Sequence, residues 1–220
     1  MPPSSASHDV TAAGVAGMSE SLRSLAARGE ERRYRKGTIL IEEGDRGDTL
    51  YIILAGRLRA YSAAANGREI TFGIYGPGEY LGEMSLDGGV RSASVRTMEA
   101  TVCAVVTRET VRRFTTERPE FAFELLSKVI RRARAATQSA KNLALNDVYG
   151  RMKLLLEALA QPRSDGTAVV EDRLTHQDLA SRLGCSREMV SRIMKDLESG
   201  GYVDQGAGRI VIHAALPARW

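Results

Sequence analysis

The residues with the clearest capacity for recognition chemistry lie in the run LTHQDLASRLGCSREMVSRIMKDLESGGYV, residues 174–203. Arg187 and Glu188 are neighbours, and Arg192 follows Glu188 by four positions, so all three would project from one end of a helix. A guanidinium can donate two hydrogen bonds to guanine O6 and N7, and a carboxylate can accept one from cytosine N4. This pattern predicts a helix end that reads base edges in a major groove. The alternative is a solvated charged face, because acidic and basic residues balance in this run.

Two helices around a tight turn would position these side chains. Thr175 followed by Asp178 is a capping-box pattern, Gly184 ends the first helix, and Ser186 caps the second. Each helix also has an apolar stripe at helical spacing, which would bury it against a small core. The stripe residues are Leu179, Ala180, Leu183, Val190, Ile193, Met194 and Leu197. The run is therefore a helix-turn-helix in outline.

Polar residues beside the base-reading positions are of types that contact phosphates. Thr175, Gln177 and Lys195 lie where a nucleic-acid backbone would run. Residues 202–212, YVDQGAGRIVI, contain two short β runs around a glycine-containing turn, which is typical of a wing that rests on the backbone. His176 is expected to contact a phosphate or to be simply exposed.

The segment GCSREMVSRIMKDLE, residues 184–198, closely resembles the helix-turn-helix of the bacterial cyclic-AMP receptor protein (CRP/FNR) family. The resemblance implies base reading in half-sites of the TGTGA type. It departs at Met189, where the family's activator has a threonine, so base preference at one step is not carried over. The implied DNA-binding residues are Thr175, Gln177, Ser186, Arg187, Glu188, Arg192 and Lys195.

A second informative run is GEYLGEMSLDGGVRSASVRT, residues 78–97. A site for a cyclic nucleotide needs a guanidinium for the phosphate, approachable backbone amides, and a carboxylate for the ribose 2′-hydroxyl. Arg91 supplies the guanidinium and Glu83 the carboxylate. The amides would come from Gly82 and from the backbone around Ser92 and Ala93. The alternative is a buried Glu83–Arg91 ion pair with a purely structural role.

This run resembles the phosphate-binding cassette of cyclic-nucleotide-binding domains, and residues 41–58, IEEGDRGDTLYIILAGRL, resemble the opening strands of those domains. The resemblance implies cyclic AMP as the ligand, with cyclic di-GMP and cyclic GMP as alternatives. Only Asp87–Val90 separate Leu86 from Arg91, a shorter connection than family members usually show, which predicts a reshaped cassette. The implied ligand-binding residues are Gly82, Glu83, Met84, Arg91, Ser92, Ala93, Arg132 and Thr137.

Short alternating runs between Gly37 and Val106, separated by glycine, aspartate, asparagine and proline, predict a β sandwich or barrel. A jelly roll of about eight strands fits this spacing. Residues 19–27 have the pattern of a short helix, and residues 30–35 are expected to form a polar connection into the first strand. Cys103 lies in an apolar strand and is expected to be a core residue.

From Pro119 to Gln161 the apolar residues recur with the period of a helix. An apolar seam there alternates spacings of four and three, which is a heptad pattern. Its members are Leu126, Ile130, Ala133, Thr137, Ala140 and Ala144. The family resemblance implies a long helix that pairs with its copy in a parallel homodimer, with the Thr137 hydroxyl meeting the adenine. Ala136 stands where the activator has threonine, and the alternative is a helix packed only on its own barrel.

Residues 145–161, LNDVYGRMKLLLEALAQ, resemble the family's hinge and the first helix of its DNA-binding domain. Asp147 is expected to cap this helix. Its expected buried stripe consists of Leu154, Leu155, Ala158 and Leu159. A loop and a short strand would follow.

The 220 residues, 43% hydrophobic and 26% charged, suit a globular protein of two small domains, and the net charge of +4 is weak support for a polyanionic partner. Neither a signal peptide nor a membrane-spanning run is present, and two cysteines make no disulfide framework, so a cytoplasmic location is expected. His8, His176 and His213 are scattered, so no metal site or catalytic triad is predicted. No iron–sulfur cluster or haem is expected, because the cysteine cluster and the axial ligands are missing.

The sequence therefore predicts an α+β chain with a flexible leader (1–20), a cyclic-nucleotide-binding-like β-barrel (21–118), a dimerisation helix (119–145) and a winged helix-turn-helix (146–220). The resemblance covers about residues 30–215 and implies a homodimeric transcription regulator. It would bind palindromic promoter DNA under allosteric control by a cyclic nucleotide and contact RNA polymerase. Two alternatives stay open: the same regulator answering cyclic di-GMP, which the short cassette loop and extra arginines favour, and a ligand-independent regulator with a vestigial barrel. An enzyme is not expected, because no nucleophile–base pair appears.

Overall fold

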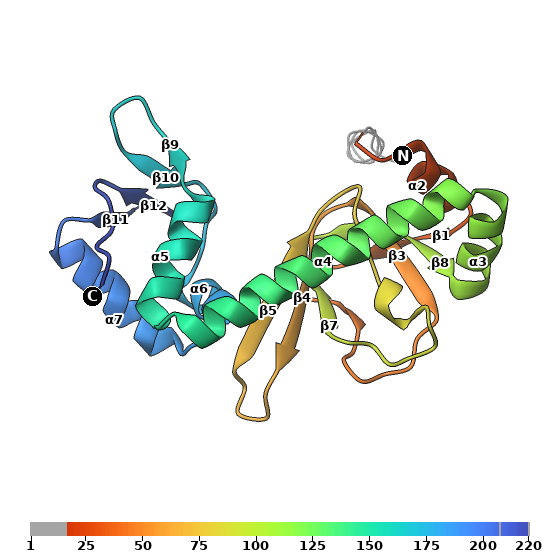
Figure 1. The fold of residues 1–220 in the computed structure, drawn as a ribbon, viewed down its shortest axis with the longest axis horizontal. Coiled ribbons are helices and arrows are strands. Elements are labelled where there is room, and N and C mark those ends of the chain that lie inside the picture. Colours follow the sequence, from red (N-terminus) through yellow and green to blue (C-terminus); the bar gives the residue numbers. More distant parts are fainter. Residues whose placement is uncertain (1–16, 207, 220) are drawn as a thin grey trace, which may run out of the picture. The chain divides into compact units, whose positions relative to one another are not determined.

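The computed structural model describes residues 17–206 and 208–219, which fold into two compact units. One unit holds the chain up to Ser62 together with Thr71–Arg132, and the other holds Ala63–Ile70 together with the chain from Ala133 onward. Figure 1 shows a β-rich body with helices for the first unit and a helical body with a small sheet for the second. The predicted α+β class is confirmed. Residues 1–16 of the predicted leader, with His8, lie outside the described residues.

Eight strands form two four-stranded sheets in the barrel, in the orders β1-β8-β3-β6 and β2-β7-β4-β5. Many neighbours in these sheets are far apart in the sequence, which is the connectivity expected of the predicted jelly roll. The strands are β1 (Glu30–Tyr34), β2 (Ile39–Ile41), β3 (Thr49–Ala55), β4 (Leu58–Ala63), β5 (Glu69–Tyr75), β6 (Tyr80–Leu81), β7 (Ser94–Thr97) and β8 (Thr101–Thr107).

The barrel has an apolar core to which both sheets contribute. Ile53 of β3, Leu58 of β4 and Cys103 of β8 are fully buried in one cluster. The strands that carry them are buried along much of their length, and β8 has four consecutive buried residues, because apolar side chains pack on both of its faces. The prediction that Cys103 is a core residue is confirmed.

The expectation of a polar connection at residues 30–35 is wrong. Strand β1 occupies Glu30–Tyr34 and pairs antiparallel with β8, from Glu30 opposite Val105 to Tyr34 opposite Thr101. Its side chains are exposed apart from the half-buried Tyr34, because β1 lies at the edge of its sheet. A strand held by backbone pairing, with charged side chains on both faces, has no alternating hydrophobic pattern to reveal it.

Helices pack on the first sheet through a second apolar cluster. Leu22 and Phe114 lie in this cluster with Ile52 of β3. Phe114 and Phe121 meet edge to face, with ring centroids 5.3 Å apart, a favoured aromatic geometry. The helices are α2 (Glu20–Ala26), α3 (Arg108–Glu117) and the long α4 (Pro119–Leu145).

The second unit contains a sheet in the order β11-β12-β10-β9 and a core built mainly from three helices. Buried side chains from the helices and from the sheet form one cluster, which includes Met152, Leu179, Met194 and Val170. The helices and strands are α5 (Val148–Leu159), α6 (His176–Leu183), α7 (Arg187–Ser199), β9 (Gln161–Pro162), β10 (Ala168–Val170), β11 (Val203–Gly206) and β12 (Arg209–Ile212).

Helix α5 has its predicted cap and part of its predicted buried face. The Asp147 carboxylate accepts a hydrogen bond from the Gly150 amide at 2.7 Å, so the cap is confirmed. Of the predicted stripe, Leu155 and Leu159 are partly buried and pack against the core, whereas Leu154 and Ala158 are exposed. The buried residues are Tyr149, Met152 and Leu156. The predicted stripe is thus confirmed only at Leu155 and Leu159, because three consecutive leucines do not fix the phase of a helical stripe.

Candidate functional site

The helix-turn-helix has the caps that its sequence predicts. The Thr175 hydroxyl accepts from the Asp178 amide at 3.1 Å, and the Asp178 carboxylate accepts from the Thr175 amide at 2.9 Å. Gly184 ends α6 with a φ of 66°, a left-handed conformation that favours glycine. The Ser186 hydroxyl then accepts from the Met189 amide at 3.2 Å and starts α7. These local bonds fix the beginning of the second helix.

The first turns of α7 present the predicted base-reading residues to solvent. Arg187, Glu188 and Arg192 are exposed, while Val190 and Ile193 of the same helix are buried in the core of the unit. Hydrogen bonds from its own amide and from the Ser186 hydroxyl lower the pKa of the Glu188 carboxyl, so it is an anionic acceptor at neutral pH. The structure thus brings these three residues together at one helix end.

The predicted phosphate-contacting residues are exposed on α6 and α7. Thr175 is the exposed N-cap of α6, Gln177 is exposed in its first turn, and Lys195 is exposed on α7. The wing consists of β11 and β12, which pair antiparallel from Val203 opposite Ile212 to Gly206 opposite Arg209. Its two strands are those that the sequence predicts.

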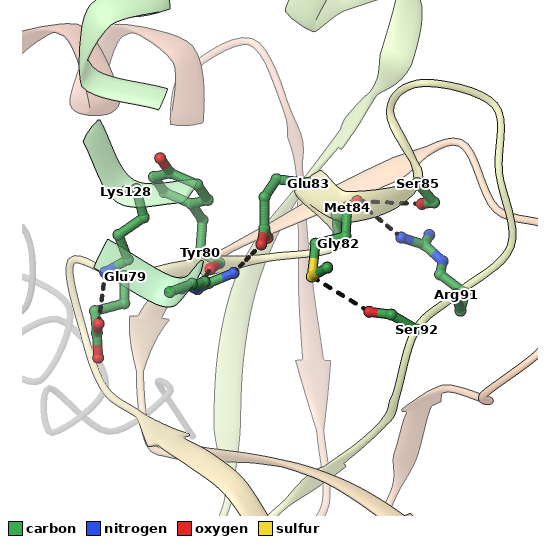
Figure 2. Close-up of polar contacts among 10 residues, drawn as sticks. Glu79, Tyr80, Gly82, Glu83, Met84, Ser85, Arg91, Ser92 and Lys128 are labelled. Carbon is green, nitrogen blue, oxygen red and sulfur yellow. Dashed lines mark hydrogen bonds and ion pairs between the residues drawn. The ribbon is translucent and has the colours of Figure 1, made fainter. Parts of the chain in front are cut away.

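The predicted cassette is built around a sharp turn after β6. Gly82 has a φ of 97°, and a Cβ there would lie 2.7 Å from Arg91 Nη1, so this position requires glycine for two reasons. The short helix η1 (Glu83–Ser85) follows it. The short connection Asp87–Val90 comes next, and an isolated antiparallel β-bridge pairs its last residue, Val90, with Arg46. The turn brings Glu83 and Arg91 into one region, as Figure 2 shows, but not into contact with each other.

Arg91 is turned toward the protein backbone. It is 6% exposed, and its terminal nitrogens donate to the Gly82 carbonyl at 3.1 Å and to the Thr49 carbonyl and hydroxyl at 3.0 and 2.9 Å. A Cβ at Gly47 would lie 2.6 Å from Arg91 Cζ, so the guanidinium packs directly on that glycine. Burial lowers the pKa of Arg91. The sequence alone shows neither the backbone acceptors nor the close approach of Gly47.

Glu83 pairs with Arg132 of α4 and not with Arg91, so the alternative of a buried Glu83–Arg91 pair is wrong. Arg132 Nη1 donates to Glu83 Oε1, and Arg132 Nη2 donates to the Tyr80 carbonyl at 2.6 Å. The Arg132 guanidinium also lies over the Tyr75 ring, 4.7 Å from its centroid. Within the described structure, two buried polar atoms of this pair have no hydrogen-bond partner, Glu83 Oε2 and Arg132 Nε.

A second ion pair joins α4 to the same strand region, and sequence reasoning missed it. Lys128 is one helical turn before Arg132, and its Nζ lies 2.6 Å from Glu79 Oε1. Glu79 Oε2 also accepts from the Gly76 amide at 3.1 Å. Figure 2 shows this pair beside Tyr80. Acidic residues four apart thus face basic residues four apart on α4, a matching that could have signalled the contact.

The remaining predicted ligand residues differ in their exposure. Met84 is 58% exposed, and the Ser92 hydroxyl, also exposed, donates to its sulfur at 3.3 Å. Ala93 is half-buried. Thr137 lies further along α4, in the second unit, and its hydroxyl donates to the Ala133 carbonyl at 3.0 Å. The structure therefore groups these ligand residues except Thr137 within the first unit.

Within residues 17–206 and 208–219, no group of three or more histidine, cysteine, aspartate or glutamate side chains is arranged to hold a metal ion. None of the helices in that part of the chain is long and apolar enough to cross a membrane.

Two family models match the chain. The cyclic nucleotide-binding domain matches residues 31–118, and the Crp-like helix-turn-helix domain matches residues 152–215. The first match contains the cassette and the second contains α6, α7 and the wing.

Several known proteins are similar to this chain over most of its length. The CRP-like cAMP-activated global transcriptional regulator of Mycobacterium tuberculosis (strain H37Rv) is 32% identical over 174 residues, which cover 77% of this chain and 78% of that protein. The cyclic AMP receptor protein of Thermus thermophilus is 32% identical over 192 residues, covering 84% and 85%. A solved structure of the c-di-GMP responsive global regulator CLP of Xanthomonas campestris matches with a TM-score of 0.77 and 25% identity, over 88% of this chain and 98% of that one.

Proposed function

Because this chain belongs to the CRP/FNR family of transcription regulators, we propose that it is a homodimer that binds palindromic promoter DNA under the control of cyclic AMP. The barrel would bind the ligand, α4 would pair the two subunits, and α7 would read bases. Cytoplasmic location and contact with RNA polymerase belong to the same proposal. The family's members are regulators, so no catalytic activity is part of it.

The observation that carries the ligand assignment is the Glu83 carboxylate. Its side chain is 2% exposed, Oε1 is paired with Arg132, and Oε2 has no partner among the described residues. A buried acceptor left without a donor costs about 1–3 kcal/mol. A ribose 2′-hydroxyl is a donor that would satisfy it. Arg132 Nε, a buried donor without a partner, would equally be satisfied by an acceptor of the same ligand.

Arg91 is the proposed phosphate contact, and ligand binding would have to change the hydrogen bonds that Arg91 makes within the protein. A guanidinium has five N–H donors, and both terminal nitrogens of Arg91 already donate to Gly82 and Thr49. A cyclic phosphate would therefore have to share these donors or displace a backbone carbonyl. The cassette turn would then rearrange with the ligand, which gives binding a route to alter the structure around it.

Exposed apolar residues on α4 support the dimer. Leu126 and Ile130 of the predicted seam are 53% and 41% exposed, and Phe123 is 73% exposed. Covering the exposed part of such side chains is worth roughly 1 kcal/mol each, because full burial is worth about 1.5–3 kcal/mol. The copy of α4 from a second subunit, with small residues such as Ala133 and Ala140 on the same seam, would cover them in a parallel pair.

The two α7 helices of such a dimer would enter successive major grooves about 34 Å apart. Arg187, Glu188 and Arg192 would read a TGTGA-type half-site in each groove, flanked by phosphate contacts from Thr175, Gln177, Ser186 and Lys195. Ligand binding would favour the arrangement of helices that fits this spacing. This is allostery if ligand and DNA raise each other's affinity by the same factor.

A second effector has its own support. The structural neighbour CLP is described as c-di-GMP responsive, and Arg131 and Arg134 of this chain are exposed on α4 on either side of Arg132. The same regulator controlled by cyclic di-GMP is therefore the alternative. A ligand-independent regulator is the other, because the backbone bonds of Arg91 are also what a purely structural arginine would make.

Calorimetric titration tests the ligand assignment. Cyclic AMP, cyclic GMP, cyclic di-GMP and 2′-deoxy cyclic AMP would be titrated into the wild-type dimer and into Glu83→Gln. If Glu83 Oε2 accepts the ribose hydroxyl, the deoxy analogue should bind about tenfold to a hundredfold more weakly than cyclic AMP, the range for a hydrogen bond to a charged group. In Glu83→Gln this difference should become smaller, because a neutral amide makes a weaker hydrogen bond to the hydroxyl than a carboxylate does.

The other outcomes are equally distinct. If only cyclic di-GMP binds, it would be the effector in place of cyclic AMP, and the proposed DNA-binding function would be unaffected. An absence of binding by all four compounds would favour the ligand-independent regulator. Equal binding of cyclic AMP and its deoxy analogue by the wild type would contradict the role given to Glu83.

A further inference from the structure

One histidine side chain connects three elements of the DNA-binding unit. His176 is the first residue of α6, and its Nδ1 lies 2.8 Å from the Ser191 hydroxyl on α7. Its Nε2 lies 2.9 Å from Gln205 Oε1 on β11. The imidazole ring thus bridges the helix that precedes the turn, the recognition helix and the wing.

The far end of this bridge is also anchored to the recognition helix. Glu198 Oε1 on α7 accepts a hydrogen bond from the backbone nitrogen of Gln205 at 3.2 Å and another from the Gln205 side-chain Nε2 at 3.1 Å. The first strand of the wing is therefore tied to α7 twice, directly through Glu198 and indirectly through His176. Together His176, Ser191, Gln205 and Glu198 form a hydrogen-bonded group that we call the histidine brace.

The donors and acceptors of the brace define one tautomer. Because the side-chain nitrogen of Gln205 donates to the Glu198 carboxylate, its oxygen is the atom that faces His176. An amide oxygen can only accept, so His176 Nε2 must carry the proton. In a neutral ring, Nδ1 is then the acceptor and the Ser191 hydroxyl is the donor. The arrangement satisfies all four groups with an uncharged imidazole.

The brace holds α7 at the level of its base-reading residues. Ser191 follows Arg187 by four residues, so the two lie one turn apart on the same side of the helix. Arg192 is the next residue. A bond to Ser191 therefore resists rotation or tilting of the helix segment that carries both arginines.

We propose that His176 is a positioning residue for base recognition, which makes the recognition helix and the wing one rigid reading surface. The inference rests on the proposed DNA binding, and it assigns to His176 a part in specificity without a contact to the bases. Loss of the brace would let α7 and the wing adjust independently, so bidentate contacts that depend on exact placement suffer more than phosphate contacts.

The tautomer can be measured in the free protein, so this test does not depend on DNA binding. Long-range nitrogen–proton NMR spectra of His176 should show the proton on Nε2 and an unprotonated Nδ1 at neutral pH. In Ser191→Ala the Nδ1 signal should shift, because its donor is gone. A proton on Nδ1, or no response to Ser191→Ala, would overturn the brace even if the protein binds DNA as proposed.

DNA binding then tests the positioning role. His176→Ala should weaken binding to a duplex with two TGTGA half-sites by about tenfold, the effect of one or two lost hydrogen bonds, and binding to a random duplex by less than about twofold. His176→Asn, whose side-chain oxygen can replace Nδ1 as the acceptor for Ser191, should recover much of the discrimination. His213→Ala is the matched control, because His213 pairs with Asp204 of the wing at 2.8 Å and not with α7.

Three results would contradict the proposal. Equal losses on both duplexes would make His176 a phosphate contact instead. Additive effects of His176→Ala and Ser191→Ala in a double-mutant cycle would show that the two residues do not act together. A loss for His213→Ala as large as that for His176→Ala would point to the wing in general. Melting curves of each variant would verify that the unit remains folded, and wild-type protein that binds neither duplex would refute the proposed function itself.

Discussion

The cassette and the recognition helix end hold the same kinds of residue in opposite states. In the cassette, the Arg91 and Glu83 side chains are buried and are bonded to other parts of the barrel and to α4. At the start of α7, Arg187, Glu188 and Arg192 are exposed to solvent. The cassette must exchange internal bonds for a ligand, whereas the recognition residues can meet DNA as they stand.

Because of this difference, substitutions in the two regions should affect folding stability and binding differently. Removing a buried, bonded side chain leaves its partners unsatisfied, so a cassette substitution should affect both folding and ligand affinity. Removing an exposed side chain changes little within the folded chain, so a recognition-helix substitution should affect DNA binding almost alone. The predictions below test this separation, beginning with the largest expected effect.

Arg91→Ala should lower the free energy of unfolding of the barrel by about 2–4 kcal/mol, because two carbonyls and the Thr49 hydroxyl lose their donor. Ligand binding should be lost as well. Urea denaturation followed by circular dichroism measures the first effect, and calorimetry the second.

Ser92→Ala is the matched control, since the Ser92 hydroxyl is exposed and bonded only to Met84 sulfur among its described contacts. It should change the stability by less than about 0.5 kcal/mol. An Arg91→Ala protein as stable as the wild type would remove the contrast between the two regions.

Arg187→Ala should weaken binding to the palindromic duplex by about 1–3 kcal/mol and relax the preference at one base pair. Its effect on unfolding should stay below about 0.5 kcal/mol. Fluorescence anisotropy with matched and single-base-changed duplexes measures the specificity.

Lys195→Ala supplies the comparison for Arg187→Ala. As a phosphate contact it should weaken all duplexes alike and reduce the slope of affinity against salt by about one. If Arg187→Ala produced the same uniform loss, its base-reading role would be wrong.

Thr175→Ala should cost about 1 kcal/mol of stability in the DNA-binding unit, because it removes a side-chain cap. Thr107→Ala, which removes the cap of α3 in the barrel, is the equivalent change in the other unit. Each should lower the melting temperature of its own unit only. A shift of both units by either variant would show that the two do not unfold separately.

The smallest effect concerns the cysteines, one in each unit. Burial raises the pKa of Cys103 to about 12, and it raises the pKa of the partly buried Cys185 as well. Since only the thiolate reacts, and it forms as pH rises towards the pKa, both should label slowly at pH 8. Cys185 should react first. Arg91→Ala should accelerate the labelling of Cys103 and leave Cys185 unchanged, which mass spectrometry of the peptides would measure.

Features set by neighbouring residues could be predicted from the sequence. The caps at Thr175, Ser186 and Asp147 depend on side chains three positions from their backbone partners, so their spacing reveals them. The exposed face of α7 follows from the same periodicity. Contacts across the fold could not be predicted in this way. The partner of Glu83 is Arg132, 49 residues away, and only the packing of α4 on the barrel decides it.

The features that the sequence did not predict correctly also depend on contacts between distant residues. Strand β1 exists through backbone pairing with β8, which charged side chains do not disclose. The buried face of α5 depends on what packs against it, because the leucines at 154–156 fit several phases. The sequence predicts a phosphate contact or simple exposure for His176, and it does not reveal the side chain's bonds, since Ser191 and Gln205 are 15 and 29 positions away.

The central claim is that a ligand in the barrel controls DNA binding, and one measurement tests it most directly. The affinity of the wild-type protein for a duplex with two TGTGA half-sites would be compared with and without saturating cyclic AMP, at one salt concentration. The account predicts tighter binding with the nucleotide, by about 5- to 150-fold, the usual range of allosteric coupling. It also predicts an equal gain in nucleotide affinity when the duplex is present. Identical DNA affinity in both conditions, with cyclic AMP shown to be bound, would contradict it.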